Sequence, residues 1–165
     1  MQQTCGSCTS RAEHPFCALA ADVLHSFEEI KEQSALGKGA VLFAEGHPSR
    51  GVYMLCEGRA RLSICSESGK RLLIRVAGPG ELLGLGASLS GEAYEFSAEL
   101  TENARVVFIK RKELLKFLRE NPSICMEVVR RLSDDLHNAY ERVRSIGLGR
   151  PRRSPRLQRV PSMAC

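Results

Sequence analysis

The spacing of apolar residues along the chain changes from helical to strand-like and then back to helical. Residues 19–35 carry apolar side chains three or four positions apart and an acidic polar face, which predicts an amphipathic helix. From residue 40 to residue 110, short runs of bulky or β-branched residues alternate with glycine turns. These runs predict strands at about 40–44, 51–56, 59–66, 71–76, 82–85, 96–100 and 104–110. Such a series is typical of a small β-barrel or jelly roll.

Glycine and proline mark the turns between the predicted strands. Glu67-Ser68-Gly69-Lys70 predicts a tight hairpin turn, and Gly78-Pro79-Gly80 predicts a second break. Gly84-Leu85-Gly86 is too short for a phosphate-binding loop, so we expect a strand corner there. The fold class expected is therefore mainly β with flanking helices.

Helical spacing returns after the last predicted strand. Residues 111–119 predict a short helix that ends before Asn121-Pro122, and Pro122 suits the first turn of a second helix over about 122–146. This second helix would be ~37 Å long, which is longer than a small barrel is wide. Its apolar stripe consists of Ile124, Val128, Leu132, Leu136, Ala139, Val143 and Ile146. Since one barrel cannot cover this stripe, we expect a homodimer interface along it; the alternative is packing on the chain's own barrel.

Positive charge is concentrated at the C-terminal end. The formal net charge is +5, and residues 150–165 hold five arginines and no acidic residue. Residues 1–149 therefore carry 19 Lys and Arg residues against 19 Asp and Glu residues. We expect a disordered basic tail and no specific DNA binding by this chain. No apolar run is long enough to span a bilayer, and no signal sequence is evident, so we expect no membrane partner and a cytoplasmic protein.

The glycine and aromatic positions occur in an order known from one family. They are Gly39-x-x-Leu42-x-x-x-Gly46, Tyr53, Gly58, the turn at Gly69, Gly80-Glu81-Leu82-Leu83-Gly84 and Phe96-Ser97-Ala98. With Asn121-Pro122 and the striped helix, they resemble the cyclic-nucleotide-binding-type domain of the bacterial CRP/FNR transcription regulators over about residues 19–149. The resemblance implies a jelly roll of the double-stranded β-helix type that senses an effector. It also implies a dimerisation helix and, behind it, a winged helix-turn-helix domain that reads DNA.

Four segments follow from this resemblance. They are a cysteine-bearing arm (1–18), the β-roll domain (19–120), the dimerisation helix (121–149) and the basic tail (150–165). The 16 residues after Gly149 are too few for a winged helix-turn-helix domain, and they suit a truncated or out-of-frame end as well as a natural tail. We expect the effector-sensing and dimerisation domain of a CRP/FNR-type regulator without its DNA-binding domain. The alternative is a stand-alone dimerising or redox- or metal-responsive interaction module that does not bind DNA.

The effector pocket implied by the resemblance is degenerate for a cyclic nucleotide. Family members similar to the cyclic-AMP receptor place a glutamate on the ribose and an arginine on the cyclic phosphate, and this chain has Leu85 and Phe96 there. Ser97 and the backbone at Gly84 remain, which is too little for a buried phosphate, so cyclic AMP is not the expected ligand. The effector itself is left open. The Phe96-Ser97 pair resembles the FNR-like branch, which senses redox state or gases.

The N-terminal arm carries a cysteine pattern that suits a metal. Cys5 and Cys8 form a CxxC pair, and Cys17 follows after eight residues. Thiolates at this spacing suit zinc or an iron–sulfur cluster. The resemblance places the distal cluster ligand of FNR-like sensors at Val107, and His14 is an alternative fourth ligand for zinc. Three free thiols without any cofactor are the competing interpretation.

An enzyme on a similar roll is the remaining class of function. Metal-dependent jelly-roll enzymes need two or three inward-facing histidines and a carboxylate, and the predicted roll contains only His47. No GxSxG motif, P-loop or dinucleotide fingerprint is present. We therefore expect a protein that is not an enzyme.

Overall fold

The computed structural model describes residues 20–147. Its elements are α1 (Ala21–Ile30), β1 (Lys31–Leu36), β2 (Val41–Phe43), β3 (Gly51–Glu57), β4 (Ala60–Cys65), β5 (Arg71–Ala77), β6 (Leu82–Leu83), α2 (Leu85–Ser90), β7 (Ser97–Leu100), β8 (Ala104–Lys110), α3 (Arg111–Glu120) and α4 (Pro122–Gly147). The strands predicted between residues 40 and 110 are all present, most of them within one or two residues of their predicted ends.

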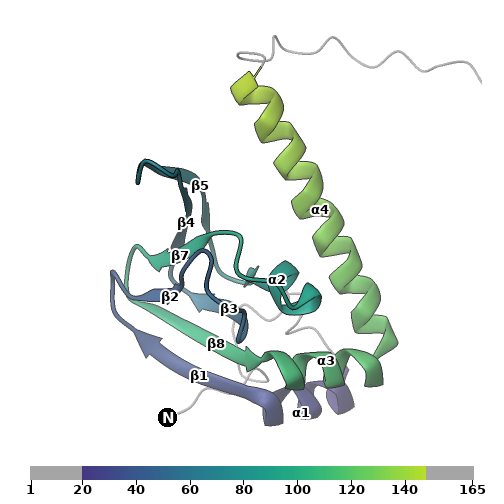
Figure 1. The fold of residues 1–165 in the computed structure, drawn as a ribbon. Coiled ribbons are helices and arrows are strands. Elements are labelled where there is room, and N and C mark those ends of the chain that lie inside the picture. The colour runs from purple at the N-terminus through teal and green to yellow at the C-terminus, as the bar shows by residue number, and fades with distance from the viewer. Residues whose placement is uncertain (1–19, 148–165) are drawn as a thin grey trace, which may run out of the picture. The chain divides into compact units, whose positions relative to one another are not determined.

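Two four-stranded antiparallel sheets form the β-roll, as predicted (Figure 1). The strand orders are β1-β8-β3-β6 in one sheet and β2-β7-β4-β5 in the other. The buried side chains of the core come from both sheets, with Leu55 and Val106 from the first and Leu62 and Leu100 from the second. Burial of these alternating apolar residues against one another is the main force that holds the two sheets face to face.

The helix predicted over residues 19–35 is shorter than expected. Helix α1 ends at Ile30, and Lys31–Leu36 is strand β1, paired with β8 from Lys31↔Ile109 to Leu36↔Ala104. No large apolar residue lies between Ile30 and Leu36, so this segment offers a helix no apolar face. As a strand it occupies the edge of the sheet and satisfies the backbone hydrogen bonds of β8 on that side.

The strand corner predicted at Gly84-Leu85-Gly86 is instead the start of a helix. Strand β6 consists only of Leu82–Leu83, and Gly84 adopts a left-handed conformation (φ +78°) directly before α2. The Ser88 hydroxyl donates a hydrogen bond to the Gly84 carbonyl (2.8 Å) and stabilises this single short turn. A positive φ is open to glycine without strain, which is why the chain can reverse direction here.

Helices α1 and α3 pack against each other beside the roll (Figure 1). The rings of Phe27 in α1 and Phe117 in α3 have centroids 5.8 Å apart, and both side chains are buried. Asn121 ends α3, and its side-chain amide donates to the Phe117 carbonyl (2.8 Å). Pro122 then begins α4, as the sequence predicts.

The chain divides into two compact units at Val128, within helix α4. In the first unit, Ile124 and Val128 at the start of α4 are buried (8% and 3% exposed). In the second unit, the rest of α4 exposes apolar side chains, among them Leu136, Val143 and Ile146 at 54%, 68% and 76%. None of the helices within residues 20–147 is sufficiently long and apolar to cross a bilayer.

Candidate effector pocket

The four positions predicted to hold the effector have taken up structural contacts. Leu85 is buried (4% exposed) at the start of α2. The half-buried Phe96 packs on Phe43, with ring centroids 5.5 Å apart. The Ser97 hydroxyl accepts a hydrogen bond from the Glu45 backbone N–H (2.9 Å). Gly84 provides the turn before α2. None of these four residues has a charged side chain that could bind a ligand.

Four arginines elsewhere in the roll are paired with glutamates. Arg75 pairs with Glu81, and Arg105 pairs with Glu57. Arg61 and Arg71 both contact Glu99, at 2.7 and 3.3 Å. The hydrogen bond from Arg61, together with the positive charges of both arginines, lowers the pKa of Glu99. These guanidinium groups are neutralised within the chain and are not available to a phosphate without breaking an ion pair.

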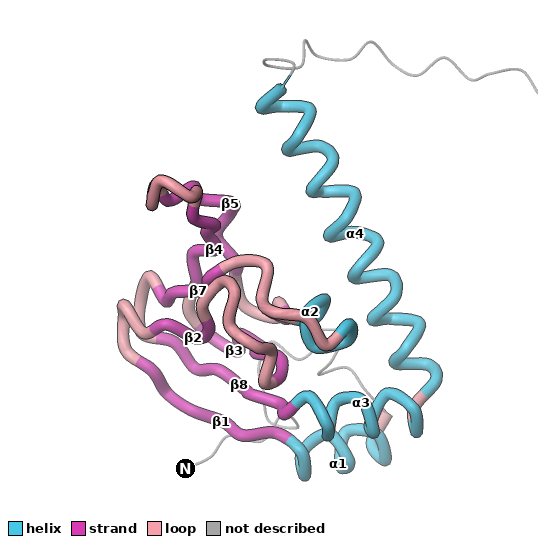
Figure 2. Tube along the Cα trace, viewed as in Figure 1, coloured by secondary structure: helices cyan, strands magenta, loops and turns pink. Residues whose placement is uncertain are grey.

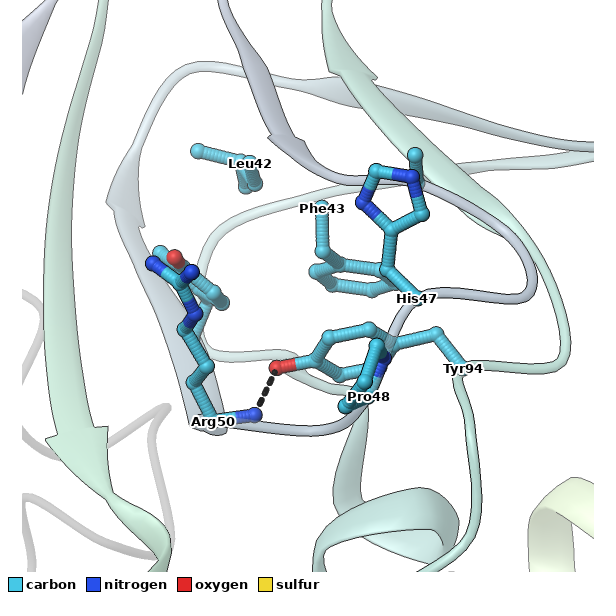
Figure 3. Close-up of a pocket in the computed structure, with 8 residues that line it drawn as sticks. Leu42, Phe43, His47, Pro48, Arg50 and Tyr94 are labelled. Atoms are coloured by element: carbon cyan, nitrogen blue, oxygen red, sulfur yellow. Dashed lines mark hydrogen bonds between the residues drawn. The ribbon is translucent and has the colours of Figure 1, made fainter.

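A pocket with a volume of about 380 Å³ lies in the β-roll, at residues other than the predicted four (Figure 3). It is lined by Leu42, Phe43, Ala44, His47, Pro48, Arg50, Tyr53 and Tyr94. These residues come from the end of β2, the loop between β2 and β3, strand β3 and the loop between α2 and β7. The size falls in the range of small-molecule binding sites.

Backbone hydrogen bonds join the two loops that form much of the pocket wall. The Gly46 N–H donates to the Tyr94 carbonyl (2.9 Å), and the Tyr94 N–H donates to the His47 carbonyl (3.0 Å). Pro48 and Ala93 form an isolated antiparallel bridge beside these bonds. The loops therefore run side by side (Figure 2), and the pocket has an ordered wall although it is built mainly from loops.

Tyr94 is the central residue of this wall. Its buried ring stacks on Phe43 with centroids 4.1 Å apart and planes 22° from parallel. Its hydroxyl donates to the Gly51 carbonyl (2.7 Å) and accepts from the backbone N–H groups of Arg50 (3.2 Å) and Gly51 (3.3 Å). Figure 3 shows the bond to Arg50 and the two rings between Arg50 and His47. The start of β3 is thus fixed to the loop before β7.

Tyr53 contributes a second hydroxyl to the pocket lining. Burial raises the pKa of Tyr53, and Tyr94 raises it further, whereas the positive charge of Arg50 acts in the opposite direction. The ring of Tyr53 also packs on Phe43 and Phe108, with centroid distances of 5.8 and 4.7 Å. The phenol is therefore neutral at physiological pH and can act as a hydrogen-bond donor or acceptor.

Sequence reasoning missed Arg50 and Tyr94, and it placed His47 only in a turn. One compositional signal was available: of the nine Phe and Tyr residues in the chain, Phe43, Tyr53, Tyr94 and Phe96 all belong to the roll sequence between the glycine turns. Ring contacts join all four through Phe43. Aromatic side chains gathered in a small β-fold could have indicated where the pocket lies.

The predicted metal ligands Cys5, Cys8 and Cys17, and also His14, lie outside the described residues. Val107, where the resemblance would place a distal ligand, is fully buried in β8. Within residues 20–147, no three His, Cys, Asp or Glu side chains are grouped as metal ligands. Metal binding by the arm therefore stays a prediction.

Comparison with known proteins gives one family match and several relatives. The model of the cyclic nucleotide-binding domain matches residues 33–121, more than half of the chain. The transcriptional activatory protein AadR of Rhodopseudomonas palustris is 31% identical over 102 residues, which cover 62% of this chain and 41% of AadR. The neuropathy target esterase sws of Drosophila persimilis is 29% identical over 125 residues, which cover 68% of this chain and 8% of the esterase. The chain therefore spans less than half the length of either relative.

Among solved structures, the catabolite activator protein of Thermus thermophilus superposes with a TM-score of 0.70 at 21% identity. The superposition covers 79% of this chain and 62% of that protein. At this identity the likeness concerns the fold, and it agrees with the two-sheet roll and the long C-terminal helix described above.

Proposed function

Since this chain belongs to the cyclic nucleotide-binding domain family, we propose that it is the effector-sensing and dimerisation part of a regulator of the CRP/FNR type. The observation that carries the proposal is the formed pocket of about 380 Å³ inside the β-roll. A concave, mostly apolar site with a few polar groups is what a small-molecule effector requires. The similarity to AadR, a transcriptional activatory protein by its name, supports a regulatory role over a catalytic one.

Dimerisation through α4 is the second part of the proposal. Between residues 129 and 147, the helix exposes Leu136, Tyr140, Val143 and Ile146, each more than half exposed. A row of exposed apolar side chains on a helix is stabilised by burial against a partner helix. Ile124 and Val128 are already buried within one chain, so the proposed seam consists of Leu132, Leu136, Ala139, Val143 and Ile146.

A binding role also suits the chemistry of the pocket. Its lining contains one histidine, one arginine and two tyrosines, but no carboxylate, serine or cysteine. The lining thus lacks the serine, cysteine and carboxylate nucleophiles of covalent catalysis, whereas its arginine and ring surfaces suit ligand binding. We therefore propose that the domain binds its ligand without transforming it, although the esterase sws contains a similar segment within a much longer chain.

A reporter fusion tests both parts together. The full chain is fused to a DNA-binding head that represses its operator only as a dimer, and repression is read in cells. We expect repression with the wild-type chain and at least a tenfold loss with Leu136→Asp combined with Val143→Asp. Asn138→Asp, an exposed polar position on another face of α4, is the control and should keep repression.

The same fusion tests effector sensing. Repression should change with the growth medium in the wild-type fusion, and it should stop responding in Ala44→Leu, which places a larger side chain in the pocket wall. A folded, expressed wild-type fusion that never represses would contradict dimerisation. A response that survives in Ala44→Leu would contradict sensing through this pocket.

A further inference from the structure

Arg50 is the only arginine in the pocket wall, and its charge is not balanced there. No ion pair joins Arg50 to a carboxylate within residues 20–147, whereas Arg61, Arg71 and Arg75 each contact a glutamate. The pocket lining also lacks acidic side chains. A guanidinium without a local counter-charge, beside apolar walls, favours an anionic group on whatever enters the pocket.

The position of Arg50 is fixed by the surrounding fold. Its backbone N–H donates to the Tyr94 hydroxyl, and its carbonyl accepts from the Arg111 N–H (2.8 Å). The side chain itself is exposed, so it can meet a ligand at the open side of the pocket. A cation on an anchored backbone loses less conformational freedom when it binds an anion than one on a mobile loop.

Apart from His47, the rest of the lining consists of aromatic and aliphatic residues. Phe43, Tyr53 and Tyr94 present ring surfaces, and Leu42, Ala44 and Pro48 add apolar area. The pocket volume of about 380 Å³ lies in the range of small-molecule sites, and a single ring with a short acidic substituent fits such a site.

We propose that the pocket binds a small organic carboxylate with a flat apolar body, the body against Phe43, Tyr53 and Tyr94 and the carboxylate on the Arg50 guanidinium. This rests on the proposed sensing function and names the class of its effector. Arginine suits a carboxylate because two parallel N–H groups can meet its two oxygens. One guanidinium is a sufficient partner for this single negative charge.

Calorimetric titration of the full chain with two matched probes tests the proposal. Phenylacetate and phenylacetamide have the same ring and nearly the same shape, but only the first is charged. We expect phenylacetate to bind at least tenfold more tightly, which corresponds to about 1.4 kcal/mol. In Arg50→Gln this preference should disappear, while in Arg59→Gln, an exposed arginine outside the pocket, it should be unchanged.

Three results would overturn the assignment. They are equal affinity for the two probes, no binding of either at millimolar concentration, and a preference for phenylacetate that persists in Arg50→Gln. NMR spectra of each variant verify that the roll is folded. The reporter fusion shows whether such a result also contradicts the proposed function. If the fusion responds in the wild type but not in Ala44→Leu, and carboxylate binding fails, sensing through the pocket stands and only the ligand class is rejected.

Discussion

Gly84 and Tyr94 are in such close contact that a Cβ atom on Gly84 would lie 2.7 Å from Cε1 of the tyrosine ring. Gly84 turns the chain into α2 with a positive φ of +78°, and Tyr94 forms the wall of the pocket. Because Gly84 has no side chain, the start of α2 can lie against the Tyr94 ring of the pocket wall.

Gly84→Ala should therefore destabilise the roll for two reasons. A left-handed backbone costs an alanine about 1–2 kcal/mol, and the new methyl group also clashes with a buried ring that cannot move freely. We expect the free energy of unfolding, measured in urea, to fall by roughly 2–4 kcal/mol.

Gly69→Ala is the matched control. Gly69 has almost the same φ (+79°), but a Cβ atom added there would meet no other atom within 4 Å. The loss of stability in Gly69→Ala should therefore reflect only the cost of an alanine in a left-handed backbone conformation. Equal losses of stability in the two variants would mean that the contact with Tyr94 carries no energy.

The strands could be predicted from the sequence because glycine turns and alternating apolar residues are local signals. Strand β1 could not, because Lys31–Leu36 becomes a strand only by pairing with β8, more than 65 residues later in the chain. Helix α2 was missed for a similar reason. Gly84 lies against the Tyr94 ring, ten residues later in the chain, and local spacing does not reveal this contact.

The family likeness predicted the roll correctly, but the pocket in the structure is lined by other residues than the four it indicated. Leu85 and Phe96, which the resemblance places at the nucleotide contacts, are part of the packing: Leu85 is buried, and Phe96 packs against the core. The cavity lies instead beside His47 and Arg50, in a loop whose conformation is set by hydrogen bonds to Tyr94. Such long-range contacts between loops leave no periodic signal in a sequence.

The ionisation of Tyr53 gives a prediction on pH. Arg50 favours the phenolate, so Arg50→Gln should raise the pKa of Tyr53 above its already raised value. The tyrosine ring carbon signals, followed by NMR against pH, report this directly. Because the folded pKa is raised, Tyr53 contributes its stabilisation in full below the ordinary tyrosine pKa of about 10, and that contribution is lost as the pH rises through the folded value. A Tyr53 pKa that stays the same in Arg50→Gln would show that the two groups do not interact, and a pKa that falls would contradict the stabilisation of the phenolate by Arg50.

Val128 and Val143 lie on the same predicted stripe but should respond differently to a charge. Val128 is buried within the chain, so Val128→Asp should unfold or strongly destabilise the first unit, by about 3 kcal/mol or more. Val143 is 68% exposed, so Val143→Asp should leave the roll folded and weaken only the dimer. Thermal unfolding with analytical ultracentrifugation distinguishes the two effects. A wild-type chain that is monomeric at all accessible concentrations would contradict the seam.

Cyclic AMP and cyclic GMP should not bind at micromolar concentration. The phosphate would meet Phe96, and Arg75 and Arg105 are each paired with a glutamate. Calorimetry with each nucleotide measures this. Micromolar affinity, about −8 kcal/mol, would contradict this prediction, and Arg50→Gln, Arg75→Gln and Arg105→Gln would then identify which arginine is used.

The cysteine arm leads to the last prediction. If Cys5, Cys8 and Cys17 bind zinc or an iron–sulfur cluster, each Cys→Ser substitution should release it, because a lost thiolate removes a coordination bond. The roll should remain folded in all three variants, since the described residues build a buried core from both sheets and α3. Metal and sulfide analysis of protein purified without oxygen, compared with Cys65→Ser as an exposed control, decides the question.

Less than about a tenth of an equivalent of metal would contradict the prediction, because a structural site with an affinity of ~10–16 kcal/mol should be nearly full. In that case the effector pocket at Arg50 would be the sensor of this chain without any contribution from the arm.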